Sequence, residues 1–221
     1  MSLTLNPQEI AQLTERVHQA QTGVRPMPRL TEDFPAMTLT DGYAVQNALR
    51  HRWLAEGRRQ VGWKAGLTSK AKMQQMGVHQ PIHGFLTSEM QVPEGGEIAL
   101  KGRIHPRIEP EIAFVLGREL RGRPSHAEAL ACVEGVCAAL EIIDSRYQNF
   151  EFQLPDVVAD NGSSSGFLLG GKLVSPSRLE LSNLGILVEI NGKPQLFGSS
   201  AAILGHPGRS LAALAALLDE Q

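Results

Sequence analysis

The chain has 221 residues, which is long enough for one large domain or two small ones. Its 21 Lys and Arg residues nearly balance its 23 Asp and Glu residues, and this net charge of −2 argues against bulk nucleic acid or an anionic membrane as a partner. Charged residues make up 20% of the chain and hydrophobic residues 42%, so wholesale disorder is excluded as well.

Residues 1–59 are predicted to form a helical region. Asn6 can cap a helix that begins at Pro7 and continues to about Gln21, and a second helix opens at Thr40. The N-terminus has no basic segment of the kind that begins a signal peptide, and no apolar run reaches the roughly 18 residues that cross a bilayer. We therefore expect a cytoplasmic protein with no membrane partner.

Residues 60–221 are predicted to form a β-rich domain. The predicted strands are 60–68, 107–116, 138–144, 166–169, 185–190 and 194–197, the last two joined by the hairpin signal Asn191-Gly192. Helices are predicted at 68–76, 125–136 and 211–218, and a turn at Pro81–Gly84. Cys132 and Cys137 are assigned to one helix as small buried residues, because two cysteines in this spacing match neither a disulfide framework nor a zinc site. The fold class is therefore α+β with a mixed or largely antiparallel sheet.

Two acidic residues in one predicted strand are the most informative feature. Glu109 and Glu111 alternate with apolar residues, so their side chains share one face of the strand. A solvated strand end would explain the pair without any function. If the strand is buried, the two carboxylates repel each other and lose hydration, and a divalent cation is the simplest compensation.

Glu141 strengthens the interpretation as a metal site. It is a single acid flanked by aliphatic residues in the strand 138–144, where surface exposure does not explain it. Three carboxylates with open positions for water suit Mg²⁺ or Mn²⁺ better than Zn²⁺, and a chelating substrate can displace such water.

Three further motifs were weighed as sites. Lys64 shares a strand face with two glycines, which leaves room for it either to face solvent or to bind a carboxylate and shuttle a proton. Residues 162–166 fit the GxSxG pattern of an esterase with Ser164 as nucleophile, but no helix is expected to follow, so this interpretation is disfavoured. Residues 166–172 imitate a phosphate-binding loop, but Leu173 replaces its Ser or Thr, and we reject that interpretation too.

Three segments together resemble the 2-oxopent-4-enoate hydratase / 4-oxalocrotonate decarboxylase family of the fumarylacetoacetate hydrolase superfamily. They are GWKAGLTSKAKMQQMG (62–77), IHPRIEPEIAFVL (104–116) and ALEIIDSRYQNFEFQLPDVVADNGSSS (139–165). The resemblance implies a helical N-terminal part on a mixed β-roll that acts as a catalytic domain, a homo-oligomer, and a role in the degradation of aromatic compounds.

The resemblance also implies roles for individual residues. Glu109, Glu111 and Glu141 match the metal ligands of the family, Lys64 its active-site lysine and Ser163 a second catalytic residue. Positions expected to bind substrate are His83, Leu67 and Asp160. Relatives continue with glycine-rich strands beyond the helix 211–218, so strands of the roll are expected to be missing from this sequence.

Decarboxylation of 4-oxalocrotonate is the favoured reaction. Pro81-Ile82-His83-Gly84 is closer to the Pro-Ile-Tyr-Gly of decarboxylases than to the Pro-Asp-x-Gly of hydratases, although His83 departs from both. The alternatives are a hydratase acting on 2-hydroxypenta-2,4-dienoate and a non-catalytic partner subunit of such enzymes. A complex with the hydratase of the pathway is a further expectation.

Overall fold

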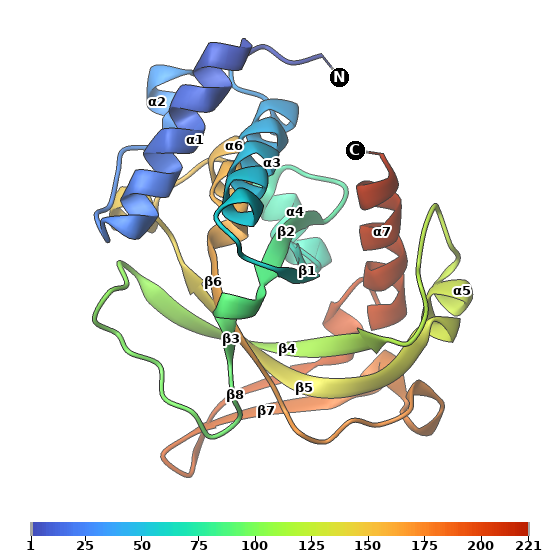
Figure 1. The fold of residues 1–221 in the computed structure, drawn as a ribbon. Helices are drawn as coiled ribbons and strands as arrows, with labels where there is room; N and C mark the ends of the chain where they lie inside the picture. Colours follow the sequence, from blue (N-terminus) through green and yellow to red (C-terminus); the bar gives the residue numbers. More distant parts are fainter. Residues whose placement is uncertain (1, 221) are drawn as a thin grey trace. The chain divides into compact units, whose positions relative to one another are not determined.

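The computed structural model describes residues 2–220 (Figure 1). Its helices are α1 (Pro7–Thr22), α2 (Leu30–Asp33), α3 (Leu39–Ala55), α4 (Lys70–Met76), α5 (His126–Ala131), α6 (Leu154–Ala159) and α7 (Pro207–Asp219). Its strands are β1 (Gln60–Gly66), β2 (Ile82–Thr87), β3 (Gln91–Val92), β4 (Pro106–Leu116), β5 (Val133–Asp144), β6 (Ser164–Leu169), β7 (Gly185–Ile190) and β8 (Lys193–Ser199). The mixed α and β content agrees with the predicted class.

The chain divides into two compact units that alternate along the sequence. Unit 1 comprises the chain up to Lys64, His83–Glu109 and Glu141–Phe167, and unit 2 comprises Ala65–Ile82, Pro110–Leu140 and the chain from Leu168 onwards. The boundaries fall inside β1, β2, β4, β5 and β6. β1 begins at Gln60, where the helical segment was expected to end; the division into domains 1–59 and 60–221 stays a prediction.

The long helices of unit 1 begin at capped residues, the first of them at the predicted cap Asn6. The side chain of Asn6 accepts hydrogen bonds from the first turn of α1, and Glu9 bonds back to the Asn6 backbone. Thr38 and Asp41 form the same capping box at the start of α3, two residues before the predicted Thr40. Such caps contribute about 1 kcal/mol each, which explains why short local signals located both helices.

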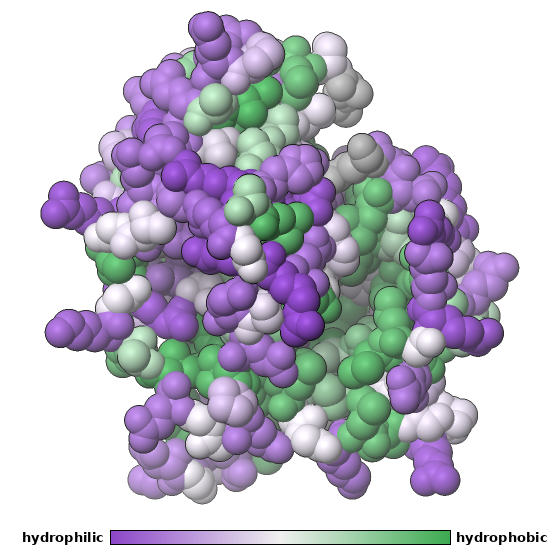
Figure 2. Space-filling view, in the orientation of Figure 1, coloured by the Kyte–Doolittle hydropathy of each residue, from purple (hydrophilic) through white to green (hydrophobic). Residues whose placement is uncertain are grey.

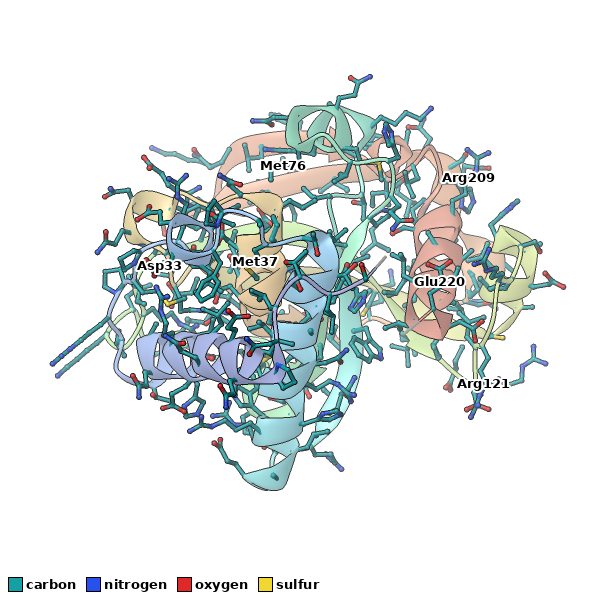
Figure 3. All side chains as sticks on the ribbon, turned by 90° about the horizontal axis from the view of Figure 1, so that it is seen from above. Asp33, Met37, Met76, Arg121, Arg209 and Glu220 are labelled. Atoms are coloured by element: carbon teal, nitrogen blue, oxygen red, sulfur yellow. The ribbon has the colours of Figure 1, made fainter. Side chains whose placement is uncertain are left out.

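The core of unit 1 lies between α1, α3 and α6. Leu13, Val17, Leu49 and Val158 have no exposed surface, and burial of each such side chain contributes about 1.5–3 kcal/mol. A Cβ atom at Gly42 would lie 2.7 Å from the carbonyl oxygen of Pro155, so only glycine lets α3 approach α6 this closely. An ion pair of 2.7 Å between Arg16 and Asp33 links α1 to α2 at the surface, where Asp33 is labelled in Figure 3.

The central sheet has the strand order β3-β6-β5-β4, and a second sheet pairs β1 with β2. β4 is an edge strand of the central sheet, with β5 as its one neighbour. β4 carries Glu109 and Glu111 and β5 carries Glu141, so this sheet positions the three candidate metal ligands.

Unit 2 contains the predicted hairpin of β7 and β8. Asn191 and Gly192 both have positive φ, and Ile190 pairs with Lys193 across the turn. The large exposed apolar side chains of this hairpin are Leu187, Ile190, Leu196 and Phe197. Hydrophobic residues open to solvent are green in Figure 2.

Helices α5 and α7 pack together in unit 2. A Cβ atom at Gly208 would lie 3.0 Å from Leu130, so glycine at the start of α7 allows this contact. Arg123 forms an ion pair with Glu220 just after α7, where Glu220 is labelled in Figure 3. Among the described residues, Ser200–Asp219 is long and apolar enough to cross a membrane by length and composition alone, which the sequence analysis did not expect; core helices of soluble proteins meet the same test.

Several element predictions are corrected by the structure. The predicted helix 125–136 ends at Ala131, because the chain enters β5 at Val133; Cys132 therefore caps α5 and Cys137 lies in β5. Cys137 is buried and Cys132 is partly exposed, and both are free thiols. The predicted turn at Pro81–Gly84 is the start of β2, since a Pro before a strand removes no hydrogen bond from its interior.

Candidate active site

The three candidate metal ligands come together. One carboxylate oxygen from each of Glu109, Glu111 and Glu141 lies within 4.8 Å of the others. Glu109 and Glu111 are two residues apart on β4, and Glu141 lies on the neighbouring strand β5. The alternation of the strands therefore gives the shared face that the sequence predicts.

The structure shows that β4 is more exposed than β5, which bears on the two alternatives that the sequence left open for the pair of acids. Ile108 is 56% exposed and Glu109 is exposed, whereas Glu141 is only 7% exposed. β4 is an edge strand, so it is less covered than the central strand β5. The cost of burying a carboxylate thus falls mainly on Glu141.

The donor set fits a hard divalent cation. Three carboxylates that converge without a histidine or cysteine are typical of Mg²⁺ or Mn²⁺ sites, in which water or a chelating substrate completes the coordination shell. Mutual repulsion of three carboxylates favours a cation among them. The residues present therefore fit the predicted cofactor.

Lys64 lies beside the most buried of these acids. Its ammonium nitrogen is 2.8 Å from Oε1 of Glu141 and donates a hydrogen bond of 2.7 Å to the carbonyl oxygen of Gly162. A Cβ atom at Gly162 would lie 2.8 Å from Cε of Lys64, and φ of Gly162 is +59°. Glycine at this position therefore makes room for the lysine, and Lys64 points into the site rather than into solvent.

The loop that carries Ser163 is held in an unusual conformation. Asn161, Gly162 and Ser163 all have φ between 52° and 59°, which is costly for the two residues with side chains. The side chain of Asn161 pairs with the backbone of Phe85 in both directions, at 2.8 and 2.9 Å, and so fixes the loop to β2. Ser163 is 2% exposed, and its hydroxyl lies 3.5 Å from Oδ2 of Asp160.

A buried ion pair also stabilises this loop. Arg146 and Asp160 are 1% and 0% exposed, and the Arg146 guanidinium binds the Asp160 carboxylate through Nε. It also donates to the carbonyl oxygens of Asp160, Asp144 and Ser164 at 2.6, 2.7 and 3.1 Å. Burial raises the pKa of Asp160 to about 6, although the neighbouring guanidinium opposes this shift.

His83 and Asp160 are not members of the converging group of acids. Asp160 is occupied by Arg146. His83 is fully buried between Tyr43, which stacks on it at 4.5 Å between ring centroids, and Trp63, at 5.4 Å. Trp63 precedes Lys64 in β1 and so points to the opposite face of that strand. Leu67 follows β1 with φ of 55° in unit 2, and the contact of all three with substrate stays a prediction.

We expect His83 to make the stability of the protein depend on pH. Burial and the nearby charge of Arg50 lower the pKa of His83 to about 4, whereas an unfolded histidine has a pKa of about 6.5. The unfolded state then binds the proton first, so the free energy of unfolding should fall as the pH is lowered from about 6.5 to about 4, by up to ~3 kcal/mol.

Urea unfolding at pH 7.5, 6.0 and 5.0 measures this effect. Because other groups also titrate, the quantity to compare is the difference between the wild type and His83→Gln at each pH. A difference that stays constant across the three pH values would show that His83 is not responsible.

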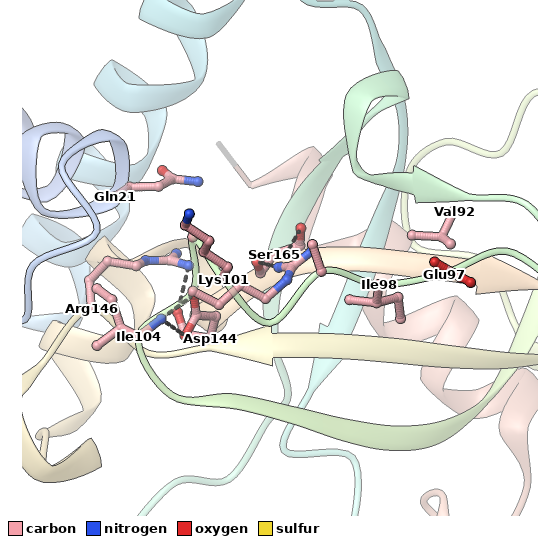
Figure 4. Close-up of a pocket in the computed structure, with 12 residues that line it drawn as sticks. Gln21, Val92, Glu97, Ile98, Lys101, Ile104, Asp144, Arg146 and Ser165 are labelled. Carbon is pink, nitrogen blue, oxygen red and sulfur yellow. Dashed lines mark hydrogen bonds between the residues drawn. The ribbon is translucent and has the colours of Figure 1, made fainter.

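A cavity of about 340 Å³ lies in unit 1 (Figure 4). It is lined by Gln21, residues 97–99 and 101–104, and by Asp144, Arg146 and Ser165, among others. The carboxylate of Asp144 accepts hydrogen bonds from the backbone N–H groups of Ile104 and His105. None of the predicted site residues lines this cavity.

Sequence reasoning did not single out Arg146, Asn161 or Asp144. Each holds the backbone around the site through hydrogen bonds that join residues distant in sequence. The available signal was their position within the segment 139–165 that carries the resemblance.

Comparisons with known proteins agree with the geometry. Residues 59–219 match the fumarylacetoacetate (FAA) hydrolase C-terminal family. The chain is 45% identical over its whole length to 4-oxalocrotonate decarboxylase of Pseudomonas sp. (strain CF600), of which it covers 84%. It is 39% identical over 92% of its length to 2-keto-4-pentenoate hydratase of Paraburkholderia xenovorans (strain LB400), of which it covers 76%. The structure of 4-oxalocrotonate decarboxylase from Pseudomonas putida G7, complexed with magnesium and adipate, superposes with a TM-score of 0.95 at 43% identity, covering 99% of this chain and 84% of that one.

Proposed function

Because the chain belongs to the FAA hydrolase C-terminal family, we propose that it is a lyase that uses Mg²⁺ or Mn²⁺ to decarboxylate 4-oxalocrotonate to 2-oxopent-4-enoate. The observation that carries the proposal is the convergence of Glu109, Glu111 and Glu141 beside Lys64. The similarity to characterised decarboxylases over the whole chain supports the choice of substrate. The names of these relatives fit a role in the degradation of aromatic compounds.

The reaction breaks the bond between the distal carboxylate and the carbon chain. CO₂ leaves, and the electron pair of the broken bond passes through the conjugated chain to the C2 oxygen. A cation held by the three glutamates supplies Lewis-acid stabilisation of the negative charge that develops there. A proton must then be delivered to the chain to give the product.

The protein side chains have separable tasks in this scheme. Glu109, Glu111 and Glu141 hold the cation. Lys64 orients Glu141 through their 2.8 Å contact and brings a positive charge and a transferable proton next to the acids. Ser163 presents its hydroxyl from the loop 161–163, whose residues have positive φ, and there it can contact the oxo-acid end of the substrate.

Hydration of 2-hydroxypenta-2,4-dienoate is the second candidate, favoured by the 39% identity to a hydratase. Both reactions need the same stabilisation of charge at the C2 oxygen, so the metal ligands and Lys64 do not separate them. We further propose a homo-oligomeric, cytoplasmic enzyme that associates with the hydratase of its pathway; the presence of both decarboxylases and hydratases among its relatives supports the choice of partner.

Incubation of the purified protein with 2-oxohex-3-enedioate and Mg²⁺ tests the proposal. We expect release of CO₂ that stops on addition of EDTA and returns with excess Mg²⁺ or Mn²⁺. Consumption of 2-hydroxypenta-2,4-dienoate without CO₂ would favour the hydratase. Activity that survives EDTA would rule out the metal-dependent mechanism, and turnover of neither substrate would favour the non-catalytic subunit.

A further inference from the structure

Two arginine side chains reach the face of the central sheet that carries the candidate metal ligands. Arg107 lies two residues before Glu109 on β4, so the two side chains point to the same face. A Cβ atom at Gly166 would lie 3.3 Å from Cδ1 of Ile142, so Gly166 and Ile142 share the opposite face. Ser165, next to Gly166, therefore lies on the metal-ligand face, where Arg103 donates a hydrogen bond to its hydroxyl.

The guanidinium of Arg107 has N–H donors that are available to a ligand. Its guanidinium carbon lies 3.7 Å from the centroid of the Phe150 ring. Within residues 2–220, this guanidinium makes no hydrogen bond or ion pair, so its five N–H donors are available to a ligand. Arg107 is exposed, whereas the guanidinium of Arg146 is buried and already donates to its protein partners.

The ring beneath Arg107 is held by a strained segment. Asn149 and Phe150 have φ of 56° and 61°, two consecutive left-handed residues with side chains, each of which costs about 1 kcal/mol or more. The ring of His105 lies 6.2 Å from that of Phe150, at an angle of 73°. This arrangement fixes the plane on which the guanidinium lies.

We propose that Arg107 binds the second carboxylate of a dicarboxylate substrate and thereby selects dicarboxylic over monocarboxylic 2-oxo acids. Residues two apart on a strand are about 6.7 Å apart. The five carbon–carbon bonds between the two carboxyl carbons of a six-carbon diacid, each about 1.5 Å long, span roughly 6 Å when extended. A substrate whose oxo-acid end lies at Glu109 thus places its other carboxylate next to Arg107.

This assignment rests on the proposed function and adds the basis of its selectivity. A planar guanidinium can donate two parallel hydrogen bonds to a carboxylate, which an ammonium group cannot match. Because Arg107 contacts the carboxylate that leaves as CO₂, its attraction stabilises the bound substrate and is lost in the products. Its removal should therefore raise KM much more than it lowers kcat.

Binding of two substrate analogues tests the proposal without turnover. The probes are 2-oxoadipate, with two carboxylates, and 2-oxohexanoate, with one, each titrated calorimetrically in saturating Mg²⁺. We expect the wild type to bind 2-oxoadipate about 10- to 100-fold more tightly, the range of one charge-assisted hydrogen-bonded pair. Arg107→Met should reduce this preference to less than about threefold, and Arg107→Lys should give an intermediate value.

The control is Arg121→Met, which removes an exposed arginine paired with Glu119, and circular dichroism checks that each variant is folded. An Arg107→Met protein that keeps the wild-type preference would overturn the assignment. Equal, Mg²⁺-dependent binding of both probes to the wild type would overturn it too, but would leave the proposed lyase intact. Failure of the wild type to bind either probe in the presence of Mg²⁺ would count against both.

Discussion

Replacing Glu141 with glutamine is expected to lower the rate of CO₂ release by about 10³-fold, because a bound cation contributes several kcal/mol to stabilising charge in the transition state. The change keeps the size of the side chain but removes one of three charges that converge within 4.8 Å. It also leaves Lys64 without its 2.8 Å carboxylate partner. Affinity for Mn²⁺, measured by electron paramagnetic resonance, should fall together with activity.

Glu134→Gln provides the matched control. Glu134 is an exposed glutamate on the same strand, β5, but outside the converging acids. Its replacement should change neither Mn²⁺ affinity nor rate. If Glu141→Gln binds Mn²⁺ as tightly as the wild type does, Glu141 is not a ligand and the proposed centre is wrong.

Removing the guanidinium of Arg146 should destabilise the protein by about 3–5 kcal/mol, the cost of leaving a buried charge without its partner. In Arg146→Met the carboxylate of Asp160, 0% exposed, loses its ion pair, and three backbone carbonyl oxygens lose a donor. Denaturation in urea, followed by tryptophan fluorescence, measures the loss.

A double variant separates the effect of the unpaired buried charge from the effect of lost side-chain packing. Arg146→Met with Asp160→Leu removes both charges, so it should be more stable than Arg146→Met alone. Arg123→Met, which breaks an exposed pair with Glu220, should cost less than about 1 kcal/mol. If Arg146→Met lost no more stability than Arg123→Met, the buried pair would contribute little.

Local signals in the sequence located most of the elements. The Asn6 cap, the Asn191-Gly192 turn and the alternation of acids around Glu109 each depend on a few adjacent residues, and each is present in the structure. The prediction of a helix over 125–136 was wrong at its C-terminal end, because contacts distant in sequence decide the structure there. Residues 133–136 have a composition that suits either state, and pairing within the central sheet decides in favour of β5.

The candidate site was predictable only in part. Alternation within β4 placed Glu109 and Glu111 together, the position of Glu141 among aliphatic residues added a third acid, and Lys64 stood out between two glycines; the resemblance gave all four their roles. The loop around Gly162 depends on contacts with Phe85, Lys64 and Arg146, which lie 16 to 98 residues away in sequence. No local pattern encodes such contacts, so the supporting residues emerged only with the coordinates.

The carboxylate of Asp144 has one further consequence. By binding the backbone N–H groups of Ile104 and His105, it anchors the chain immediately before β4 begins. The alignment of the first glutamate with its neighbours is thereby set by a clamp from β5 and does not depend on the length of the preceding connection. A change in the length of the connection 93–102 should therefore leave the cation-binding geometry unaltered.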